Sequence, residues 1–304
     1  MGILEGKVAI VTGAGRGVGR GEALELAAEG ARVVVNDLGG SLGGEGTDQR
    51  PADYVAQIIR DRGGQAVADY EDVADWQGAE RLIGHAVSEF GGLDILVNNA
   101  GILRDKMIFT MEEADWDSVI RVHLKGTFAP TRHACAYWRQ ESKAGRPRNA
   151  AIVNTVSGAG LRGNVGQANY GSAKAAIAGL TVITSLEMAR YGVRCNAISP
   201  AGTTRISGTV TKAEIKEPDE YAGFDPQNPQ NSAPTVAWLA SDQAMHVTGQ
   251  VFRAIGPTIW RYEGWQLGVS ITSRNEQKWC AADIGPAVNA HIFGSRAVGL
   301  GMGR

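Results

Sequence analysis

Residues 7–19 read KVAIVTGAGRGVG, and this stretch decides the fold. Val8 to Val11 form an unbroken apolar run rich in β-branched residues, which is typical of a buried parallel strand. The run ends in a glycine-rich turn, and a helical pattern follows from about Arg20 to Glu29. Backbone N–H groups in such a turn can approach a pyrophosphate at the N-terminus of the helix. The stretch therefore predicts a dinucleotide site, or else a tight strand-to-helix turn without a ligand.

A second predicted strand, residues 32–36, leads into Asp37, which lies 24 positions beyond Gly13. At that spacing an acidic side chain meets the ribose hydroxyls of a bound adenosine. Its carboxylate would repel a 2′-phosphate, so the sequence favours NAD over NADP. Arg16 in the glycine-rich turn favours NADP instead, because a guanidinium there could attract that phosphate. Asp37 could also be a turn residue at the strand end, which would leave a cofactor site intact.

Strand-like segments alternate with helix-like segments as far as about residue 255. The predicted strands are residues 7–12, 31–36, 65–69, 93–97, 150–156, 193–198 and 249–254. The predicted helices are residues 17–29, 51–62, 76–90, 112–142, 168–191 and 232–241. This alternation indicates a doubly wound parallel sheet with helices on both faces, a Rossmann fold in a single α/β domain.

The chain divides into an expected nucleotide-binding domain, residues 1–255, and an irregular extension, residues 256–304. Within the domain, residues 200–231 form a long loop after the sixth strand, a natural place for a lid over a substrate. The extension holds several aromatic residues, among them Trp260 and Trp279, and exposed aromatics at that density are unusual. We therefore expect it to pack on its own core or on a neighbouring subunit.

The composition excludes several classes of protein. The 304 residues carry a net charge of −2, so the chain as a whole does not attract nucleic acid or an anionic membrane surface by its charge. We find no apolar run of membrane-spanning length and no metal-ligand spacing. The three scattered cysteines favour reduced thiols, which are typical of a cytoplasmic protein. The N-terminus leads directly into the first predicted strand, which favours the same location.

Tyr170 and Lys174 stand four positions apart in YGSAK, and Ser157 lies upstream in NTVSGAG. A phenol has an ordinary pKa of about 10, so it exchanges protons poorly near neutral pH. A lysine one helical turn away can stabilise the phenolate and bring that pKa down. Ser157 could hold a substrate oxygen while Tyr170 gives or takes a proton. This set of residues predicts acid–base chemistry beside the dinucleotide site.

These motifs, in this order, resemble those of the short-chain dehydrogenase/reductase family over about residues 5–255. The motifs are TGAGRGVG, the Asp72-Val73 pair, NNAG at residues 98–101, Ser157, YGSAK, and SPAGT at residues 199–203. The resemblance implies a nicotinamide-dependent oxidoreductase that interconverts a secondary alcohol and a ketone. It also implies that Ser157 orients the substrate oxygen and that Tyr170 is the acid/base.

The resemblance further assigns the cofactor contacts. Gly13, Gly17 and Gly19 would line the pyrophosphate site, together with their neighbours Arg16 and Val18. Asp72 beside Val73 would receive the adenine amino group, Asn99 would contact the adenosine ribose, and Lys174 would hold the nicotinamide ribose. Residues 200–203, which end in Thr203, would border the carboxamide.

His123 departs from the family pattern. The family usually has an asparagine in the long crossover helix, where it supports a water-linked proton path, but this chain reads RVHLKG over residues 121–126. Histidine can also bind water and carry protons, so His123 is a candidate catalytic residue. It could instead be a structural side chain that a backbone carbonyl or a water satisfies.

The same segment, with NDLGG and GNVGQANYGSAK, is most similar to the (3R)-hydroxyacyl-CoA dehydrogenase region of peroxisomal type 2 multifunctional enzymes of lipid metabolism. This implies a free-standing bacterial-type relative that acts on a 3-hydroxyacyl-CoA with NAD. A steroid or other alicyclic alcohol remains an alternative substrate, and a catalytically silent NAD-binding protein is a more distant one. The long helices also imply a homodimer or homotetramer, since family members pair through them.

Overall fold

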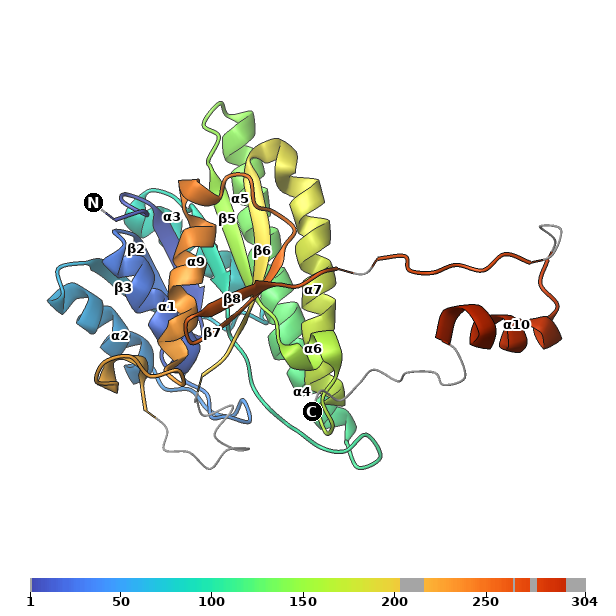
Figure 1. Cartoon of the computed structure of the whole chain (residues 1–304). Coiled ribbons are helices and arrows are strands. Elements are labelled where there is room, and N and C mark those ends of the chain that lie inside the picture. The colour runs from blue at the N-terminus through green and yellow to red at the C-terminus, as the bar shows by residue number, and fades with distance from the viewer. Residues whose placement is uncertain (1, 203–215, 265, 274–277, 294–304) are drawn as a thin grey trace. The chain divides into compact units, whose positions relative to one another are not determined.

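The computed structural model describes residues 2–202, 216–264, 266–273 and 278–293 (Figure 1). The chain divides into two compact units, Met1–Tyr262 and Glu263–Arg304. The first unit extends past residue 255, where the sequence placed the boundary, because one further strand joins the sheet. The second unit holds the helix α10 (Ala281–Val288), followed by the π-helical turn η7 (Asn289–Phe293). The packing of this extension on a core or a neighbouring subunit stays a prediction.

The first unit is built on one eight-stranded sheet of order β3-β2-β1-β4-β5-β6-β7-β8. The neighbouring strands are parallel, except that β8 runs antiparallel to β7. The strands are β1 (Val8–Thr12), β2 (Arg32–Asn36), β3 (Gln65–Asp69), β4 (Ile95–Asn98), β5 (Ala150–Thr155), β6 (Val193–Pro200), β7 (Val251–Ile255) and β8 (Thr258–Arg261). This arrangement confirms the predicted doubly wound fold.

Strand β8 was not predicted. The chain reverses at Gly256, whose φ of 51° is one that glycine adopts readily, and β8 then pairs with β7 at the sheet edge. All four residues of β8 are exposed. An exposed edge strand has no buried face, so its sequence lacks the apolar pattern that marks the other strands.

Helices cover both faces of the sheet (Figure 1). The α-helices in the described part of the first unit are α1 (Gly17–Ala28), α2 (Arg50–Asp61), α3 (Trp76–Phe90), α4 (Glu113–Ile120), α5 (Gly126–Lys143), α6 (Gly158–Arg162), α7 (Ala168–Met188) and α9 (Ala233–Ala240). Short 3₁₀ turns follow at η2 (Ala189–Tyr191), η3 (Pro218–Glu220), η4 (Pro229–Ser232) and η5 (Asp242–Ala244). The helical stretch expected over residues 112–142 is confirmed, and within it the π-helical segment η1 (Arg121–Lys125) joins α4 to α5 without a gap.

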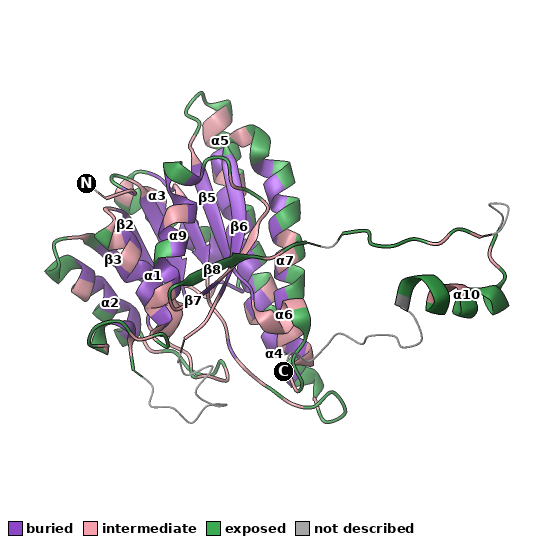
Figure 2. Cartoon of the chain, in the orientation of Figure 1, coloured by how far each residue is buried: buried purple, intermediate pink, exposed green. Residues whose placement is uncertain are grey.

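Alternate residues of the buried strands point to opposite faces of the sheet, and each face carries its own hydrophobic core. In β1, Ala9 and Val11 face a cluster that includes α1, α2 and α9. Val8 and Ile10 face the opposite cluster, which includes α3, α5 and α7. Figure 2 shows the central strands as buried between these helical layers. Since both faces are covered, the strands read as continuous apolar runs, as the sequence suggested.

The chain order places a ligand crevice at the carboxyl ends of β1 and β4. From β1 the chain passes to β2 on one side, whereas β4 pairs with β1 on the other. The loops after these two strands therefore diverge, which opens a crevice at the point where the strand order reverses.

Candidate active site

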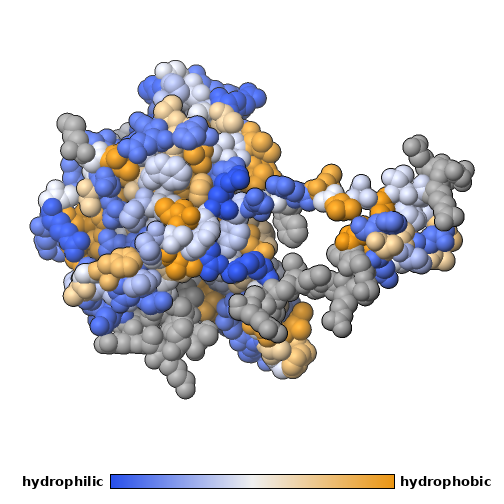
Figure 3. Space-filling model, in the orientation of Figure 1, coloured by the Kyte–Doolittle hydropathy of each residue, from blue (hydrophilic) through white to orange (hydrophobic). Residues whose placement is uncertain are grey.

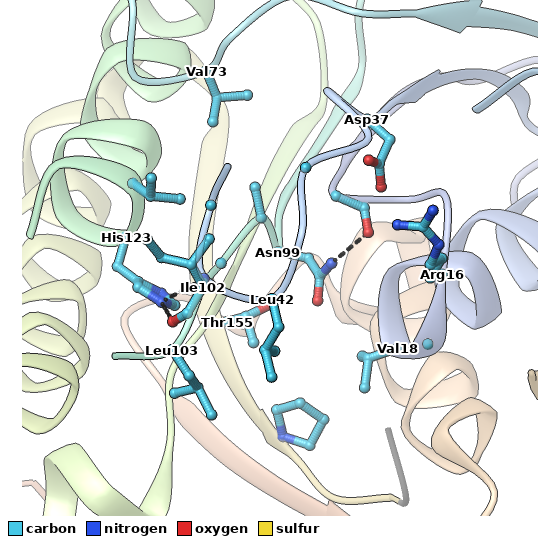
Figure 4. A pocket seen from close by; sticks show the side chains of 18 of the residues that line it. Arg16, Val18, Asp37, Leu42, Val73, Asn99, Ile102, Leu103, His123 and Thr155 are labelled. Carbon is cyan, nitrogen blue, oxygen red and sulfur yellow. Dashed lines mark hydrogen bonds between the residues drawn. The ribbon is translucent and has the colours of Figure 1, made fainter. Parts of the chain in front are cut away.

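A cavity of about 530 Å³ lies at this crevice (Figure 4). It is lined by nearly all of the residues that the sequence singled out: Gly13, Arg16, Gly17, Val18, Asp37, Asp72, Val73, Asn99, His123, Ser157, Tyr170 and Lys174. Gly19 is not among the lining residues, and Thr203 lies outside the described residues. The fold thus brings segments from both halves of the domain to one cavity.

The glycine-rich turn needs glycine for two different reasons. Gly13 has a φ of 63°, and a Cβ there would lie 2.7 Å from the Cα of Ala100, so a side chain would clash with the loop after β4. At Gly19 a Cβ would lie 2.3 Å from Nδ2 of Asn99. Gly19 therefore packs behind the turn, and its role is to bring α1 close to Asn99 rather than to line the cavity.

A carboxylate lies at the start of α1. The backbone N–H of Gly17 donates a hydrogen bond of 2.7 Å to Oε2 of Glu217, which precedes η3. The positive end of a helix favours an anion at this position. Glu217 shows that the turn can hold an anionic oxygen of the kind a pyrophosphate carries.

Asp37 joins the glycine turn to the loop that follows β2. Its Oδ2 accepts a hydrogen bond of 2.8 Å from the N–H of Gly15, and its Oδ1 accepts one of 2.6 Å from the N–H of Gly39. Arg16 and Asp37 both line the cavity, and Figure 4 shows their side chains on the same side of it. Asp37 is therefore more than a turn residue, because it organises the edge of the cavity.

Residues 38–48 form a loop that we call the strap, because it crosses from β2 to the loop after β4. The N–H of Leu103 donates to the carbonyl of Leu42 at 3.1 Å. Nε of Arg104 donates to the carbonyl of Gly43 at 3.0 Å. Gly44 lies against Ile102, since a Cβ on it would be 3.0 Å from the Ile102 side chain. The strap thereby covers one side of the cavity (Figure 4).

Asp72 and Asn99 are held by the backbone around the cavity. Oδ1 of Asp72 accepts from the N–H of Ala74 at 2.8 Å, while its Oδ2 pairs with Arg121. Nδ2 of Asn99 donates to the carbonyl oxygens of Thr12 and Gly13 at 3.0 and 3.1 Å. Both side chains are thus fixed before any ligand binds.

Ser157, Tyr170 and Lys174 meet beside the cavity. Ser157 caps α6, and a hydrogen bond links its side chain to that of Tyr170. Nζ of Lys174 donates to the carbonyl of Thr155 at 2.6 Å and lies 5.7 Å from the centre of the Tyr170 ring. Lys174 is buried, with 3% of its surface exposed. The four-residue spacing on α7 places the phenol and the amine on one face, as predicted.

Burial dominates the proton affinities of this group. It raises the pKa of Tyr170, and the hydrogen bond from Ser157 offsets part of that rise. It lowers the pKa of Lys174 to about 7, and the charge of Glu22 on α1 offsets part of that fall. The expectation that Lys174 brings the pKa of Tyr170 toward neutrality is therefore not met in the protein alone, because desolvation is the larger effect.

His123 lies in η1, fully surrounded by protein. Its Nε2 is 2.8 Å from the carbonyl oxygen of Ile102 and 3.1 Å from the Ile102 nitrogen, and its ring meets the Tyr170 ring edge-on at 5.1 Å. Burial lowers the pKa of His123 to about 3, so the ring is uncharged at neutral pH. The backbone partner that the structural alternative required is present, and Nδ1 has no partner among the described residues.

Sequence reasoning did not single out several residues of the cavity, among them Thr155, the strap residue Leu42, and Glu217. Thr155 ends β5, and the general rule that ligands lie at the carboxyl ends of parallel strands could have found it. Leu42 and Glu217 carried no such signal, because each reaches the cavity through a loop contact that only the folded chain reveals.

The described residues offer neither a metal site nor a helix that could span a membrane. Among the described residues no group of three or more His, Cys, Asp or Glu side chains could hold a metal ion. In the same part of the chain no helix has both the length and the apolar character needed to cross a membrane.

The fold and this cavity define a dinucleotide-binding oxidoreductase that acts on CH–OH groups, with a buried tyrosine–lysine pair. A family model for short chain dehydrogenases matches residues 7–215, and the chain belongs to that family. This confirms the family resemblance that the motifs indicated.

Individual relatives agree with this assignment. The chain is 47% identical over 259 residues to hydroxyacyl-CoA dehydrogenase ChsB1 of Mycobacterium tuberculosis, covering 84% of this chain and 79% of that protein. It is 44% identical to peroxisomal multifunctional enzyme A of Dictyostelium discoideum over 81% of this chain, which spans 52% of that longer protein. A crystal structure of a short chain dehydrogenase from Mycobacterium avium superposes with a TM-score of 0.84 at 50% identity, covering 95% of each chain.

Proposed function

We propose that this protein is an NAD-dependent dehydrogenase that oxidises the hydroxyl group of a 3-hydroxyacyl thioester, reversibly, to the ketone. The observation that carries the proposal is the hydrogen-bonded Ser157–Tyr170 pair above the buried Lys174, at the edge of a cavity large enough for a dinucleotide. A binding protein without catalytic activity would have no need of three such groups in this arrangement.

The residues present fit a nicotinamide dinucleotide. Gly13 and Gly17 line the cavity, and the N–H of Gly17 already binds a carboxylate in the place of a phosphate oxygen. Asp37 and Asn99 would meet the adenosine ribose, Asp72 with Val73 the adenine, and Lys174 the nicotinamide ribose. The carboxylate of Asp37 favours NAD over NADP, although Arg16 stands close by. When bound, the nicotinamide supplies the hydride acceptor.

The chain's own residues carry the proton transfer. Tyr170, as the phenolate, would take the hydroxyl proton of the substrate, while Ser157 donates a hydrogen bond to the oxygen that becomes the carbonyl. Lys174 in its ammonium form would stabilise the phenolate. His123 would act as a positioning residue, since its ring lies against Tyr170 and its Nε2 holds Ile102. An uncharged, fully buried imidazole is poorly suited to carry protons to solvent.

The relatives support the thioester substrate. ChsB1 is named as a hydroxyacyl-CoA dehydrogenase, and the multifunctional enzymes are named as peroxisomal proteins. A 3-oxoacyl-[acyl-carrier-protein] reductase of Staphylococcus aureus is also 39% identical over 82% of this chain. Two of these three names describe enzymes acting on acyl thioesters, so a thioester is a better supported substrate than a ring alcohol.

We also infer that the chain assembles as a homodimer or homotetramer through α5 and α7. Apolar side chains lie exposed on these helices, with 44% of Phe128, 55% of Ile183 and 75% of Leu186 accessible. Apolar groups gather along the side of the first unit formed by α7 (Figure 3). A surface of this kind is typical of a subunit interface.

The test is NADH formation with a panel of (3R)- and (3S)-hydroxyacyl-CoAs, hydroxysteroids and other alicyclic alcohols, each with NAD and with NADP. We expect turnover of a hydroxyacyl-CoA with NAD. Tyr170→Phe should abolish turnover and leave NAD binding largely intact. Turnover of a ring alcohol alone would overturn the substrate class, and turnover by Tyr170→Phe would overturn the mechanism.

A further inference from the structure

Gln167 lines the cavity beside the catalytic group, and the mechanism above does not use it. It is the residue that precedes α7, and its carbonyl accepts the N–H of Gly171 at 2.7 Å. Tyr170 follows three residues later, a spacing that places two side chains on one face of a helix, and it lines the same cavity. A polar side chain in this place meets the part of the substrate that lies next to the reacting carbon.

Two hydrogen bonds fix the direction of the Gln167 amide. Its Oε1 accepts from Nδ2 of Asn164 at 2.8 Å, and its Nε2 donates to Oδ2 of Asp105 at 2.7 Å. An ionised carboxylate can only accept hydrogen bonds, so the NH2 end of the amide faces Asp105. Nε2 carries two hydrogens, and among the described residues Asp105 takes one of them. The other N–H is left for a ligand in the cavity.

The backbone on both sides of Asp105 is attached to the start of α7. Nδ2 of Asn169, a fully buried side chain, donates to the carbonyl of Arg104 at 2.9 Å. On the other side, Lys106 forms a parallel β-bridge with Gln167. The carboxylate of Asp105 is therefore held beside Gln167 as a fixed negative charge.

The cationic side chains near Asp105 have other partners. Lys106 pairs with Asp115 at 2.7 Å, and Arg104 donates to the strap. The cations that line the described part of the cavity are Arg16, Arg121, Lys174 and Lys216. All but Lys174 come from segments around the predicted cofactor site, and Lys174 already donates to a backbone carbonyl. An anion next to the reacting carbon would therefore meet the negative charge of Asp105.

We propose that Gln167 and Asp105 form the subsite for the thioester carbonyl of the substrate. Nε2 of Gln167 donates to the carbonyl oxygen, and Asp105 repels a carboxylate from the same place. This inference rests on the proposed function and specifies its substrate. In a 3-hydroxyacyl thioester a single methylene group separates the carbonyl carbon from the carbinol carbon, so the carbonyl lies beside the hydroxyl group that Ser157 and Tyr170 hold.

The subsite distinguishes two compounds with the same carbon skeleton. The thioester is neutral at its carbonyl, whereas the free 3-hydroxy acid carries a negative charge there, which Asp105 disfavours. Selection thus uses an attractive contact for one compound and a repulsive one against the other. A reaction that joins the acid to a thiol must therefore precede the step that this protein catalyses.

The decisive variant is Gln167→Met, which keeps the length of the side chain and removes the donor. It is assayed with 3-hydroxybutyryl-CoA and with S-(3-hydroxybutyl)-CoA, a thioether in which a methylene group replaces the carbonyl. We expect kcat/KM to fall about tenfold for the thioester and to change little for the thioether. Equal losses on both substrates would indicate a displaced Tyr170 and overturn the proposal, and so would full activity on both.

Gln227→Met is the matched control, because Gln227 is another glutamine that lines the cavity. Whatever its effect on turnover, the ratio of the thioester rate to the thioether rate should stay that of the unmodified protein. Gln167→Leu replaces Gln167→Met if the methionine variant does not fold. An equal change of the ratio in the Gln227 variant would contradict the assignment to Gln167.

Asp105→Asn tests the repulsive part of the subsite. It removes the charge and keeps an oxygen that can accept from Nε2 of Gln167. The rate with free 3-hydroxybutyrate, relative to the thioester, should rise roughly threefold to tenfold, since the carboxylate is exposed and partly screened. Asp117→Asn, at an exposed acid of α4 that is not among the lining residues, should leave this ratio unchanged. Equal ratios in Asp105→Asn and the unmodified protein would overturn the exclusion of acids.

A binding measurement separates this inference from the proposed function. Acetoacetyl-CoA and S-(3-oxobutyl)-CoA are titrated calorimetrically into the complex with NAD, in which no hydride can be transferred because cofactor and ligand are both oxidised. Gln167→Met should weaken the binding of acetoacetyl-CoA about tenfold and leave that of the thioether nearly unchanged. The same binding in the variant and the unmodified chain would overturn this inference even if the dehydrogenase reaction were established. Absence of turnover on every hydroxyacyl-CoA, with the binding difference present, would overturn the proposed function alone.

Discussion

Glu217 places a carboxylate oxygen 2.7 Å from the backbone nitrogen of Gly17, at the position where the glycine-rich turn opens into α1. A pyrophosphate bound there needs the same N–H group. Glu217 therefore competes with the cofactor, and its negative charge opposes a second anion in the same place. The loop that carries Glu217 belongs to the segment that the sequence suggested as a lid.

Glu217→Ala should accordingly tighten NAD binding, by roughly threefold to tenfold, since it frees one N–H donor and removes a like charge. Isothermal titration of NAD measures the change directly. Glu220→Gln is the matched control, because it removes a neighbouring charge and retains an acceptor for the N–H of Glu217. Equal NAD affinities for Glu217→Ala and the unmodified protein would contradict the competition, because they would mean that the Glu217–Gly17 contact does not weaken NAD binding.

The pH dependence should differ between the two directions of the reaction. Oxidation of the alcohol needs the Tyr170 phenolate, and burial raises the pKa of Tyr170. The oxidation rate should therefore rise through neutral pH and continue to rise in alkaline buffer. Reduction of the ketone uses the neutral phenol, so its rate should be retained at neutral pH and fall as the pH passes the pKa of Tyr170. Initial rates in both directions at saturating cofactor test this, and an oxidation rate that peaks below neutrality contradicts it.

His123 should make the fold sensitive to acid. Burial lowers its pKa to about 3 in the folded chain, against 6.5 for an ordinary histidine. The unfolded chain binds the proton first, so the free energy of unfolding should fall as the pH drops from 6.5 toward 3. For a fully buried group the total loss is on the order of 5 kcal/mol.

His123→Asn removes this titration and keeps an amide that can bond to Ile102. Urea unfolding at neutral and at mildly acidic pH should show a smaller loss of stability in the variant. His123→Leu also removes the titration but leaves the Ile102 backbone unpaired, which costs roughly 1–3 kcal/mol at neutral pH. Parallel losses of stability in all three proteins on acidification would refute this account of His123.

Arg104 should determine how long the cofactor stays bound. Its Nε donates to the Gly43 carbonyl of the strap, so Arg104→Ala should loosen the strap and raise the NADH dissociation rate several-fold, by the loss of roughly 1 kcal/mol. Stopped-flow fluorescence measures that rate. Glu45→Gln removes only the exposed 3.4 Å ion pair with Arg104 and should leave the rate nearly unchanged. If both variants release NADH at the original rate, the strap does not retain the cofactor.

Leu186 should report on assembly. A charge in the centre of an apolar interface is strongly unfavourable, so Leu186→Glu should shift the chain to a smaller species in sedimentation at micromolar concentration. Leu267→Glu, which changes a still more exposed leucine in the second unit, provides the comparison. An unmodified chain that sediments as a monomer would remove the basis of the inferred interface.

Much of the first unit follows from the sequence because its elements are locally determined. The apolar runs of β1 and β2, the glycine turn, and the Tyr170–Lys174 spacing each depend on neighbours within a few residues. The π-helical segment around His123 does not. It contains His123, which contacts Ile102, 21 residues away in the chain, and no local pattern encodes that contact.

The burial of Glu22 could not be predicted from the sequence either. In the sequence Glu22 looks like one of several acids on a surface helix, RGEALELAAEG, and helical periodicity places it near the boundary of the apolar face. Only the packing of α1 against the sheet and η4 distinguishes it from Glu25. The sequence of the strap, LGGSLGGEG at residues 38–46, is typical of a loop, but its attachment to Leu103 and Arg104 is a long-range contact.

The attachment of the strap restricts how this protein can be re-engineered. Cofactor preference is usually altered in the residues after β2, which here belong to the strap. The strap, however, lies on Ile102, Ile102 is bound to His123, and His123 lies against Tyr170. We therefore expect a change made to accept a different nucleotide to alter turnover as well, because this series of contacts leads from the strap to the catalytic tyrosine.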